Sequence, residues 1–173
     1  TQLEFSYIND LLKKSDLKKN IFVFEVNSKK NIVLISIKKD IKSSDIENLG
    51  AELYGRINYG KNSEYFLYTN NVSTKNKDFF GHFLHGLKLK SYEFKKYKTK
   101  KETRIISINV LGNKDKSTTQ SRLKFKSIEE GTFYARDLVS EPGNVLHPDE
   151  YAKRLNSLRK DGLKINIYDK KKL

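Results

Sequence analysis

The chain has 173 residues and a formal net charge of +14 at pH 7, and 36% of its residues are hydrophobic, 12% aromatic and 32% charged. This composition is typical of a globular protein and not of a disordered one, and the lack of any cysteine excludes disulfides and thiolate metal sites. Its apolar runs are strand-sized, far below the roughly 18 residues of a membrane span. No segment has the pattern of a secretion signal, so we expect a cytoplasmic protein without membrane contact.

Three β-rich runs open the chain. Leu3–Ile8 is predicted to be a strand, and a polar segment separates it from the runs Ile21–Val26 and Ile32–Ile37. The last two runs flank the polar sequence NSKKN. A five-residue connection of this kind is typical of a hairpin or another tight return.

Helix and strand patterns alternate after these runs. Ser44 and Glu47 have the spacing of a capping box at the start of an amphipathic helix. Apolar residues repeat at helical intervals in that helix at Ile46, Leu49, Leu53 and Ile57. The run EYFLYT after Gly60 predicts a strand buried on both faces. A second helix is indicated by one apolar stripe, formed by Phe80, Phe83, Leu84, Leu87 and Phe94. The alternation predicts an α/β fold, with a mixed sheet flanked by helices.

A domain boundary is predicted after the buried strand Ile105–Leu111. The polar segment 112–121 has no apolar residue, so residues 1–111 are expected to form an N-terminal α/β domain and 112–121 a junction. Residues 122–173 are then predicted to form a long linker helix, a second helix and a strand. The stripe of the linker helix is predicted to contain Phe125, Ile128, Thr132, Ala135 and Val139.

Prolines and a glycine mark the boundaries within this last segment. Pro142 ends the linker helix, because its ring cannot continue it, and Pro148 stands at the start of the next helix. Asp161-Gly162 supplies the stop for that helix. Leu163, Ile165 and Ile167 then alternate with polar residues, which predicts a strand.

The sequence ARDLVSEPGNVLHP resembles the start of the catalytic domain in leucyl (cytosol) aminopeptidases, where the pattern is close to A-R-D-L-V-N-x-P-x-N-x-L-T-P. Nine residues match in type and spacing, namely Ala135, Arg136, Asp137, Leu138, Val139, Pro142, Asn144, Leu146 and Pro148. Ser140 replaces the usual Asn. His147 replaces the usual Thr and is a poorer helix cap. Upstream, Gly81–Lys98 is similar to the helix of the family's N-terminal domain that ends in Y-x-F-x-x-Y-K.

The resemblance implies an N-terminal domain with a macro-domain-like fold. It further implies a parent enzyme that removes N-terminal amino acids from peptides during intracellular protein turnover. The family uses two divalent ions, such as zinc or manganese, and assembles as homohexamers. This chain would then be the N-terminal part of a cytoplasmic metallopeptidase, serving assembly or regulation.

The family's metal-binding motifs, which resemble G-K-G-x-T-F-D-S-G-G and N-T-D-A-E-G-R, do not occur in this sequence. His82 and His85 could share a helix face, but no third ligand is indicated and a structural role is favoured. We therefore assign no catalytic and no metal-binding residues, and we predict that the chain alone is inactive.

The positive charge is unevenly distributed. Ser127–Leu173 has nine Lys/Arg and eight Asp/Glu, which leaves +13 of the charge on residues 1–126. The densest cluster consists of Lys95, Lys96, Lys98, Lys100, Lys101 and Arg104. One interpretation is a DNA-binding module that contacts phosphates. Another is the lysine-rich composition of a chain encoded in AT-rich DNA. A noncatalytic paralogue kept for assembly is a third alternative.

Overall fold

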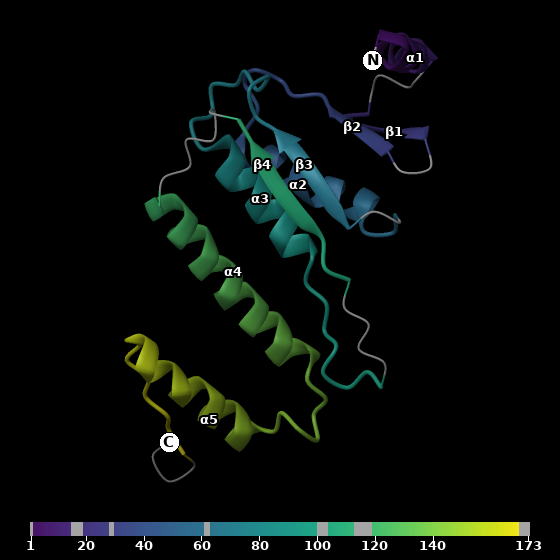
Figure 1. Cartoon of the computed structure of the whole chain (residues 1–173). Coiled ribbons are helices and arrows are strands. Elements are labelled where there is room, and N and C mark those ends of the chain that lie inside the picture. Colours follow the sequence, from purple (N-terminus) through teal and green to yellow (C-terminus); the bar gives the residue numbers. More distant parts are fainter. Residues whose placement is uncertain are drawn as a thin grey trace.

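The computed structural model describes residues 2–14, 19–27, 30–60, 63–99, 104–112 and 119–169 (Figure 1). Helices and strands alternate along most of the chain, which confirms the predicted α/β class. The elements are, in order, α1 (Gln2–Lys14), β1 (Ile21–Asn27), β2 (Lys30–Ile35), α2 (Ser43–Ile57), β3 (Glu64–Tyr68), α3 (Phe79–Lys90), β4 (Ser107–Leu111), α4 (Thr119–Ser140), α5 (Pro148–Ser157) and the 3-10 helix η1 (Leu158–Asp161).

The strands form two small sheets. β1 and β2 pair antiparallel with Val23 opposite Val33, which confirms the predicted hairpin. β3 and β4 pair in parallel with Phe66 opposite Asn109. Parallel strands need a crossover connection, and here it runs through α3. Within the described residues, the predicted mixed sheet is thus present as two two-stranded sheets flanked by helices.

The core lies where α2 and α3 pack together beneath the strands. The predicted stripe of α2 is buried, at Ile46, Leu49, Leu53 and Ile57. Three residues of α3 join the same cluster, namely Phe79, Phe80 and Phe83. A Cβ atom added to Gly86 would lie 1.9 Å from the carbonyl oxygen of Glu47, and one added to Gly50 would lie 2.0 Å from that of Phe83. These two glycines therefore let the helix backbones touch.

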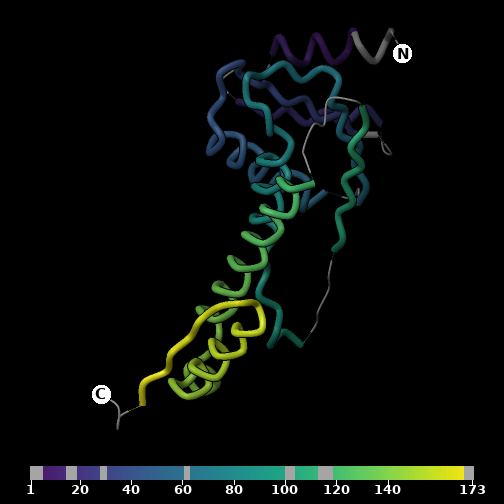
Figure 2. The backbone as a smooth tube through the Cα atoms, turned by 90° about the vertical axis from the view of Figure 1, so that its left-hand side faces the viewer, coloured from purple at the N-terminus to yellow at the C-terminus, as the bar shows by residue number. Residues whose placement is uncertain are grey.

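Beyond this core the chain is elongated. Figure 2 shows α4 leaving the body formed by the sheets, α2 and α3, with α5 folded back beside its far end. The N- and C-termini lie at opposite ends of the molecule (Figures 1 and 2). α4 ends before Pro142 and α5 begins at Pro148, as predicted, and Gly162 follows η1 with a left-handed φ of 89°.

Two predictions near the N-terminal ends of helices are wrong. Leu3–Ile8 lies in helix α1 and not in a strand. Leu3, Tyr7 and Leu11 also repeat every four residues, and a helix satisfies its backbone groups without a partner strand. The capping box of Ser44 is absent, because α2 has Lys42 as its N-cap without a side-chain cap bond. The carboxylate of Glu47 instead contacts His82.

Two predictions of burial and one of a strand also need correction. Phe66 and Tyr68 of β3 are 55% and 69% exposed, because the core covers only one face of the β3–β4 sheet. Ile105 precedes β4 and is exposed. Leu163, Ile165 and Ile167 form no strand, since no described strand pairs with them.

The buried face of α4 also differs from the predicted stripe. Phe125 and Leu138 are buried, whereas Ile128 and Val139 are exposed. Polar contacts of α4 with other segments, rather than apolar spacing alone, fix which face turns inward.

Candidate functional site

The matched motif lies at the end of α4, against the last turn of α3 and the segment that follows it. The Arg136 guanidinium donates a hydrogen bond to the carbonyl oxygen of Leu89 at 2.7 Å and lies 5.5 Å from the centre of the Tyr92 ring. The Tyr92 hydroxyl donates to Oδ1 of Asp137 at 2.7 Å, and its ring packs on Phe133. The two family-like segments, one from each side of the predicted junction, therefore bind each other directly.

The remaining motif residues lie in the last turns of α4, in the turn that follows it and at the start of α5. The carbonyl oxygen of Pro142 accepts hydrogen bonds from the backbone N–H groups of Val145 and Leu146, both at 2.9 Å. His147 is the N-cap of α5 and makes no side-chain cap bond, as expected of a poor cap. Ala135, Val139, Pro142 and Asn144 are exposed, Leu146 is half-buried and Leu138 is buried. The side chains of these six motif residues carry no group that could act as a nucleophile, an acid or a base.

Glu141 is the best-connected acidic residue of this region, and sequence reasoning did not single it out. Its side chain is only 2% exposed. The Lys96 ammonium and the Tyr97 hydroxyl donate to its two oxygens, and Nη1 of Arg154 donates to Oε1 at 3.0 Å. Hydrogen bonds from Lys96 and Tyr97, with a further one from Arg154, lower the pKa of Glu141 to about 2. The carboxylate is therefore ionised at neutral pH.

The two histidines of α3 contact different helices. Nδ1 of His82 lies 2.7 Å from Oε1 of Glu47 on α2, and Nδ1 of His85 lies 2.9 Å from Oε1 of Glu129 on α4. The Phe125 ring lies against both imidazoles, with centroid distances of 5.0 and 4.8 Å. These pairs support a structural role, because each histidine joins α3 to a neighbouring helix.

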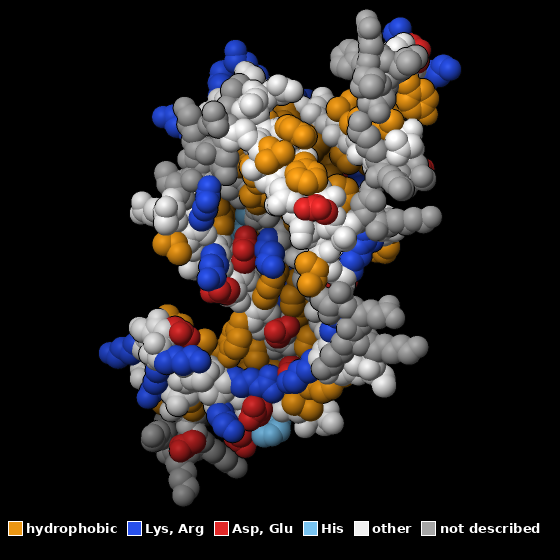
Figure 3. Space-filling model, viewed as in Figure 1, with side chains coloured by type: hydrophobic (Ala, Val, Ile, Leu, Met, Phe, Trp, Pro, Cys, Tyr) orange, Lys and Arg blue, Asp and Glu red, His pale blue; other side chains and the backbone are white. Residues whose placement is uncertain are grey.

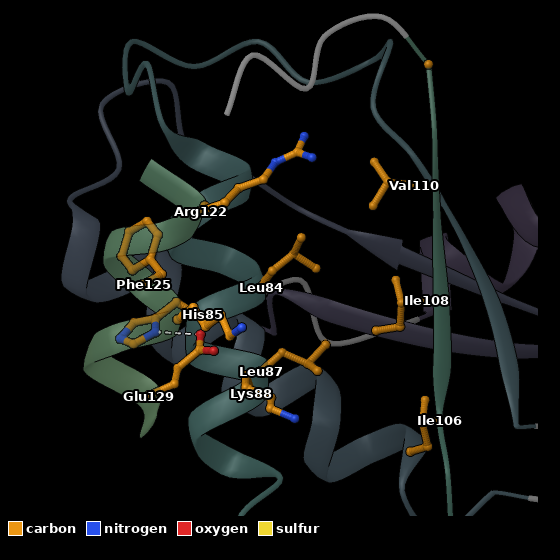
Figure 4. Close-up of a pocket in the computed structure, with 13 residues that line it drawn as sticks. Leu84, His85, Leu87, Lys88, Ile106, Ile108, Val110, Arg122, Phe125 and Glu129 are labelled. Carbon is orange, nitrogen blue, oxygen red and sulfur yellow. Dashed lines mark hydrogen bonds and ion pairs between the residues drawn. The ribbon is translucent and has the colours of Figure 1, made fainter. Parts of the chain in front are cut away.

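A cavity of about 730 Å³ lies between α3, α4 and β4 (Figure 4). The wall on the side of β4 is apolar and is formed by Ile108 and Val110 of this strand and by Ile106, which precedes it. Leu84 and Leu87 face this wall from α3. The His85–Glu129 pair lies at its α4 side. In the described ranges no three or more His, Cys, Asp or Glu side chains are grouped so that they could hold a metal ion. These residues thus do not fit a two-metal centre.

Three residues of the predicted basic cluster bind other residues of the chain. Lys96 is bound to Glu141, Lys95 forms an ion pair with Glu93, and Arg104 donates to the carbonyl oxygen of Asn58 at 2.5 Å. Lys98 is exposed. Lys100 and Lys101 lie outside the described residues. No described helix is both long enough and apolar enough to cross a membrane.

Comparison with known proteins gives one consistent result, although no protein-family model matches the chain. The chain is 32% identical over 134 residues to a probable cytosol aminopeptidase of Bradyrhizobium sp., an alignment that covers 75% of this chain and 27% of the relative. It is 28% identical over 152 residues to a probable cytosol aminopeptidase of Wolbachia pipientis. This alignment covers 83% of this chain and 29% of the relative.

Solved structures show a similar fold at low sequence identity. A mutant of tomato leucine aminopeptidase matches with a TM-score of 0.73 and 17% identity, covering 99% of this chain and 37% of that one. The bottromycin maturation enzyme BotP in complex with Mn matches with a TM-score of 0.67 and 14% identity. This match covers 91% of this chain and 34% of the BotP chain. The chain thus spans between about a quarter and two fifths of the length of these relatives.

Proposed function

Because this chain belongs to the leucyl (cytosol) aminopeptidase family, we propose that it is the N-terminal domain of such an enzyme with the helices that lead into its catalytic domain. The observation that carries this proposal is the direct contact of Arg136 and Asp137 with Leu89 and Tyr92. In this proposal, the contact joins the motif at the end of α4, which would begin the catalytic domain, to α3 and the segment after it, which would end the N-terminal domain. The role of the chain itself is then assembly and orientation.

The complete enzyme would release N-terminal amino acids from peptides in the cytoplasm, as its relatives' name indicates. It would use two divalent ions, zinc or manganese, which supply a water activated for attack on the peptide bond. The complex of the similarly folded BotP with Mn supports this assignment. The ions would be held by residues outside the described part of this chain, and the enzyme would assemble as a homohexamer.

A direct test compares this chain with the longest protein encoded by its gene. Both are assayed on leucyl anilide with added manganese. We expect hydrolysis by the longer protein and none by residues 1–173. Hydrolysis by the purified chain that saturates with stoichiometric metal would contradict the assignment of the chemistry to other residues.

A noncatalytic paralogue is the second candidate, and it makes a different prediction. The coding sequence after Leu173 would then lack the lysine and carboxylates of the two metal motifs. The longer protein would be inactive with every divalent ion but would still assemble.

A further inference from the structure

Glu141 differs from the other acidic residues of α4 and its flanks because it binds two separate segments at once. Lys96 and Tyr97 belong to the segment that follows α3, whereas Arg154 belongs to α5. The carboxylate of Asp137, by comparison, accepts a hydrogen bond from Tyr92 on the first of these segments. In Figures 1 and 2 the segment after α3 runs down beside the far end of α4, where α5 also lies. The Glu141 carboxylate therefore connects the end of α4 both to the segment after α3 and to α5.

The backbone at Glu141 adds to this convergence. Its N–H donates to the carbonyl oxygen of Asp137 at 3.1 Å, so it still belongs to the last turn of α4. Pro142 follows and cannot continue the helix. Glu141 thus lies where α4 ends and the turn that leads to α5 begins.

Arg154 is fixed by several bonds as well. Its Nε donates to Oε1 of Glu150 at 3.0 Å, and its carbonyl oxygen accepts bonds from Tyr134 of α4 at 3.1 Å and from Ser157 at 2.7 Å. Lys153 also lies 3.9 Å from Oε2 of Glu150, so the cations Lys96, Arg154 and Lys153 meet the two carboxylates Glu141 and Glu150. Removal of the Glu141 charge would leave Lys96 without its carboxylate partner and Arg154 with Glu150 alone.

Charged side chains also surround this part of the molecule on the face drawn in Figure 3, where basic and acidic groups lie next to one another around a hollow lined by hydrophobic ones. Apolar packing between α4 and α5 is limited, since no residue of α5 is fully buried. The orientation of α5 therefore depends on polar bonds to a greater degree than the orientation of α3 does.

We propose that Glu141 is a positioning residue that locks α5 in one orientation against α4 and the Lys96–Tyr97 segment, and so sets the direction in which the next domain leaves the N-terminal domain. This proposal rests on the proposed function only where it concerns a catalytic domain. The lock itself is a property of the described residues. Position 141 falls on a variable position of the family pattern, so the lock is not implied by the resemblance.

The lock can be measured as a distance distribution. The chain has no cysteine, so Ser44→Cys on α2 and Asn156→Cys on α5, both exposed, give two unique sites for spin labels. With Glu141 intact we expect one narrow distribution of label distances. Glu141→Gln should raise the fraction of molecules with label distances outside this narrow distribution on the order of tenfold. The reason is that Lys96 and Arg154 lose the negative charge that they share. Tyr97→Phe removes one donor and should broaden the distribution less.

A matched control is Glu130→Gln on α4, the helix that ends just before Glu141. Glu130 pairs with Lys126 at 3.8 Å, and both side chains are largely exposed, so the distribution should not change. Circular dichroism and the core unfolding transition should remain as in the parent chain, which separates loss of orientation from loss of fold. An unchanged narrow distribution in folded Glu141→Gln would overturn the lock.

Activity of the longest protein encoded by the gene gives the second readout. If it hydrolyses leucyl anilide, Glu141→Gln should lower kcat/KM while Glu130→Gln leaves it unchanged. If the unmutated protein is inactive, the proposed function fails, yet the distance measurement still decides the lock. If the protein is active and the labels show no change, the lock fails alone.

Discussion

The helix pair α2–α3 and the joint at the end of α4 hold the chain together through different interactions. α2 and α3 meet through two glycines and a cluster of buried apolar side chains. The joint consists of one shielded carboxylate with two cations and a phenol. Close apolar packing should resist changes of pH and salt, whereas an ionic joint should respond to both. The chain thus combines a rigid body with an attachment whose strength depends on ionisation.

The largest effect should come from Gly86→Ala in the helix pair. A methyl group there would meet the Glu47 carbonyl at 1.9 Å, so a helix backbone must move. We expect a loss of about 3 kcal/mol, the upper end of the usual cost of overpacking, in the free energy of unfolding measured with urea. Gly55→Ala on α2 is the control, because nothing lies within 4 Å of its added methyl group. It should be neutral or stabilise by roughly 0.5–1 kcal/mol. An equal change in the free energy of unfolding for Gly86→Ala and Gly55→Ala would show that α2 and α3 do not pack this closely.

The docking of α4 on α3 should give an effect of similar or slightly smaller size. Phe125 is 8% exposed and packs on both histidines of α3, so Phe125→Ala should cost about 3 kcal/mol of stability, near the lower end for buried aromatic residues. Leu123→Ala, at a position that is 59% exposed on the same helix, should cost little. Urea unfolding of both variants is the measurement. A Leu123 effect as large as that of Phe125 would place the docked face elsewhere on α4.

The joint should show its own dependence on pH. The ordinary pKa of a glutamate, 4.5, is lowered to about 2 for Glu141 in the folded chain. Its contribution is therefore present above pH 4.5 and is lost as the pH falls through the folded pKa of about 2. Arg154 lowers the pKa of Glu150 in the same direction. Glu141→Gln should consequently lower stability at pH 7, and the difference from the unmutated chain should shrink between pH 4.5 and 2. A difference independent of pH would contradict the ionic account.

The smallest effect is expected for DNA binding by the basic cluster. Lys95, Lys96 and Arg104 already have internal partners, so we expect no measurable binding of labelled duplex DNA at about 50 mM salt. Lys98→Ala and Lys96→Ala provide a matched pair of variants. Binding with a log-log salt slope that falls by about one in Lys98→Ala would instead favour the DNA-binding module.

Local pattern was sufficient for the boundaries of the helices on either side of the turn in the second half of the chain. Pro142 and Pro148 mark the end of α4 and the start of α5 directly, because proline has fixed effects on helix boundaries. The stripe from Ile46 to Ile57 likewise predicted the buried face of α2. These features depend on neighbours within one or two turns. The proposed junction at 112–121 stays a prediction, since residues 113–118 lie outside the described ranges.

Features that depend on distant partners were not predictable. Glu141 follows a helix and reads as an ordinary surface residue, and only folding brings Lys96, 45 positions away, to its carboxylate. The same holds for Glu47, which binds His82 instead of capping α2. At the N-terminus, Leu3–Ile8 fits both strand and helix periodicity. Sequence pattern alone could not decide between them.

Hydrogen exchange on the 173-residue chain tests most directly the claim that a rigid body carries a separately stabilised joint. Amides of α2 and α3 should exchange only through global unfolding, while those of α5 and of Val145 and Leu146 should exchange through a smaller opening. Glu141→Gln should speed exchange in α5 and leave α2 and α3 unchanged. Equal protection of α2 and α5, with the same response of both to Glu141→Gln, would contradict the account and show one cooperative unit.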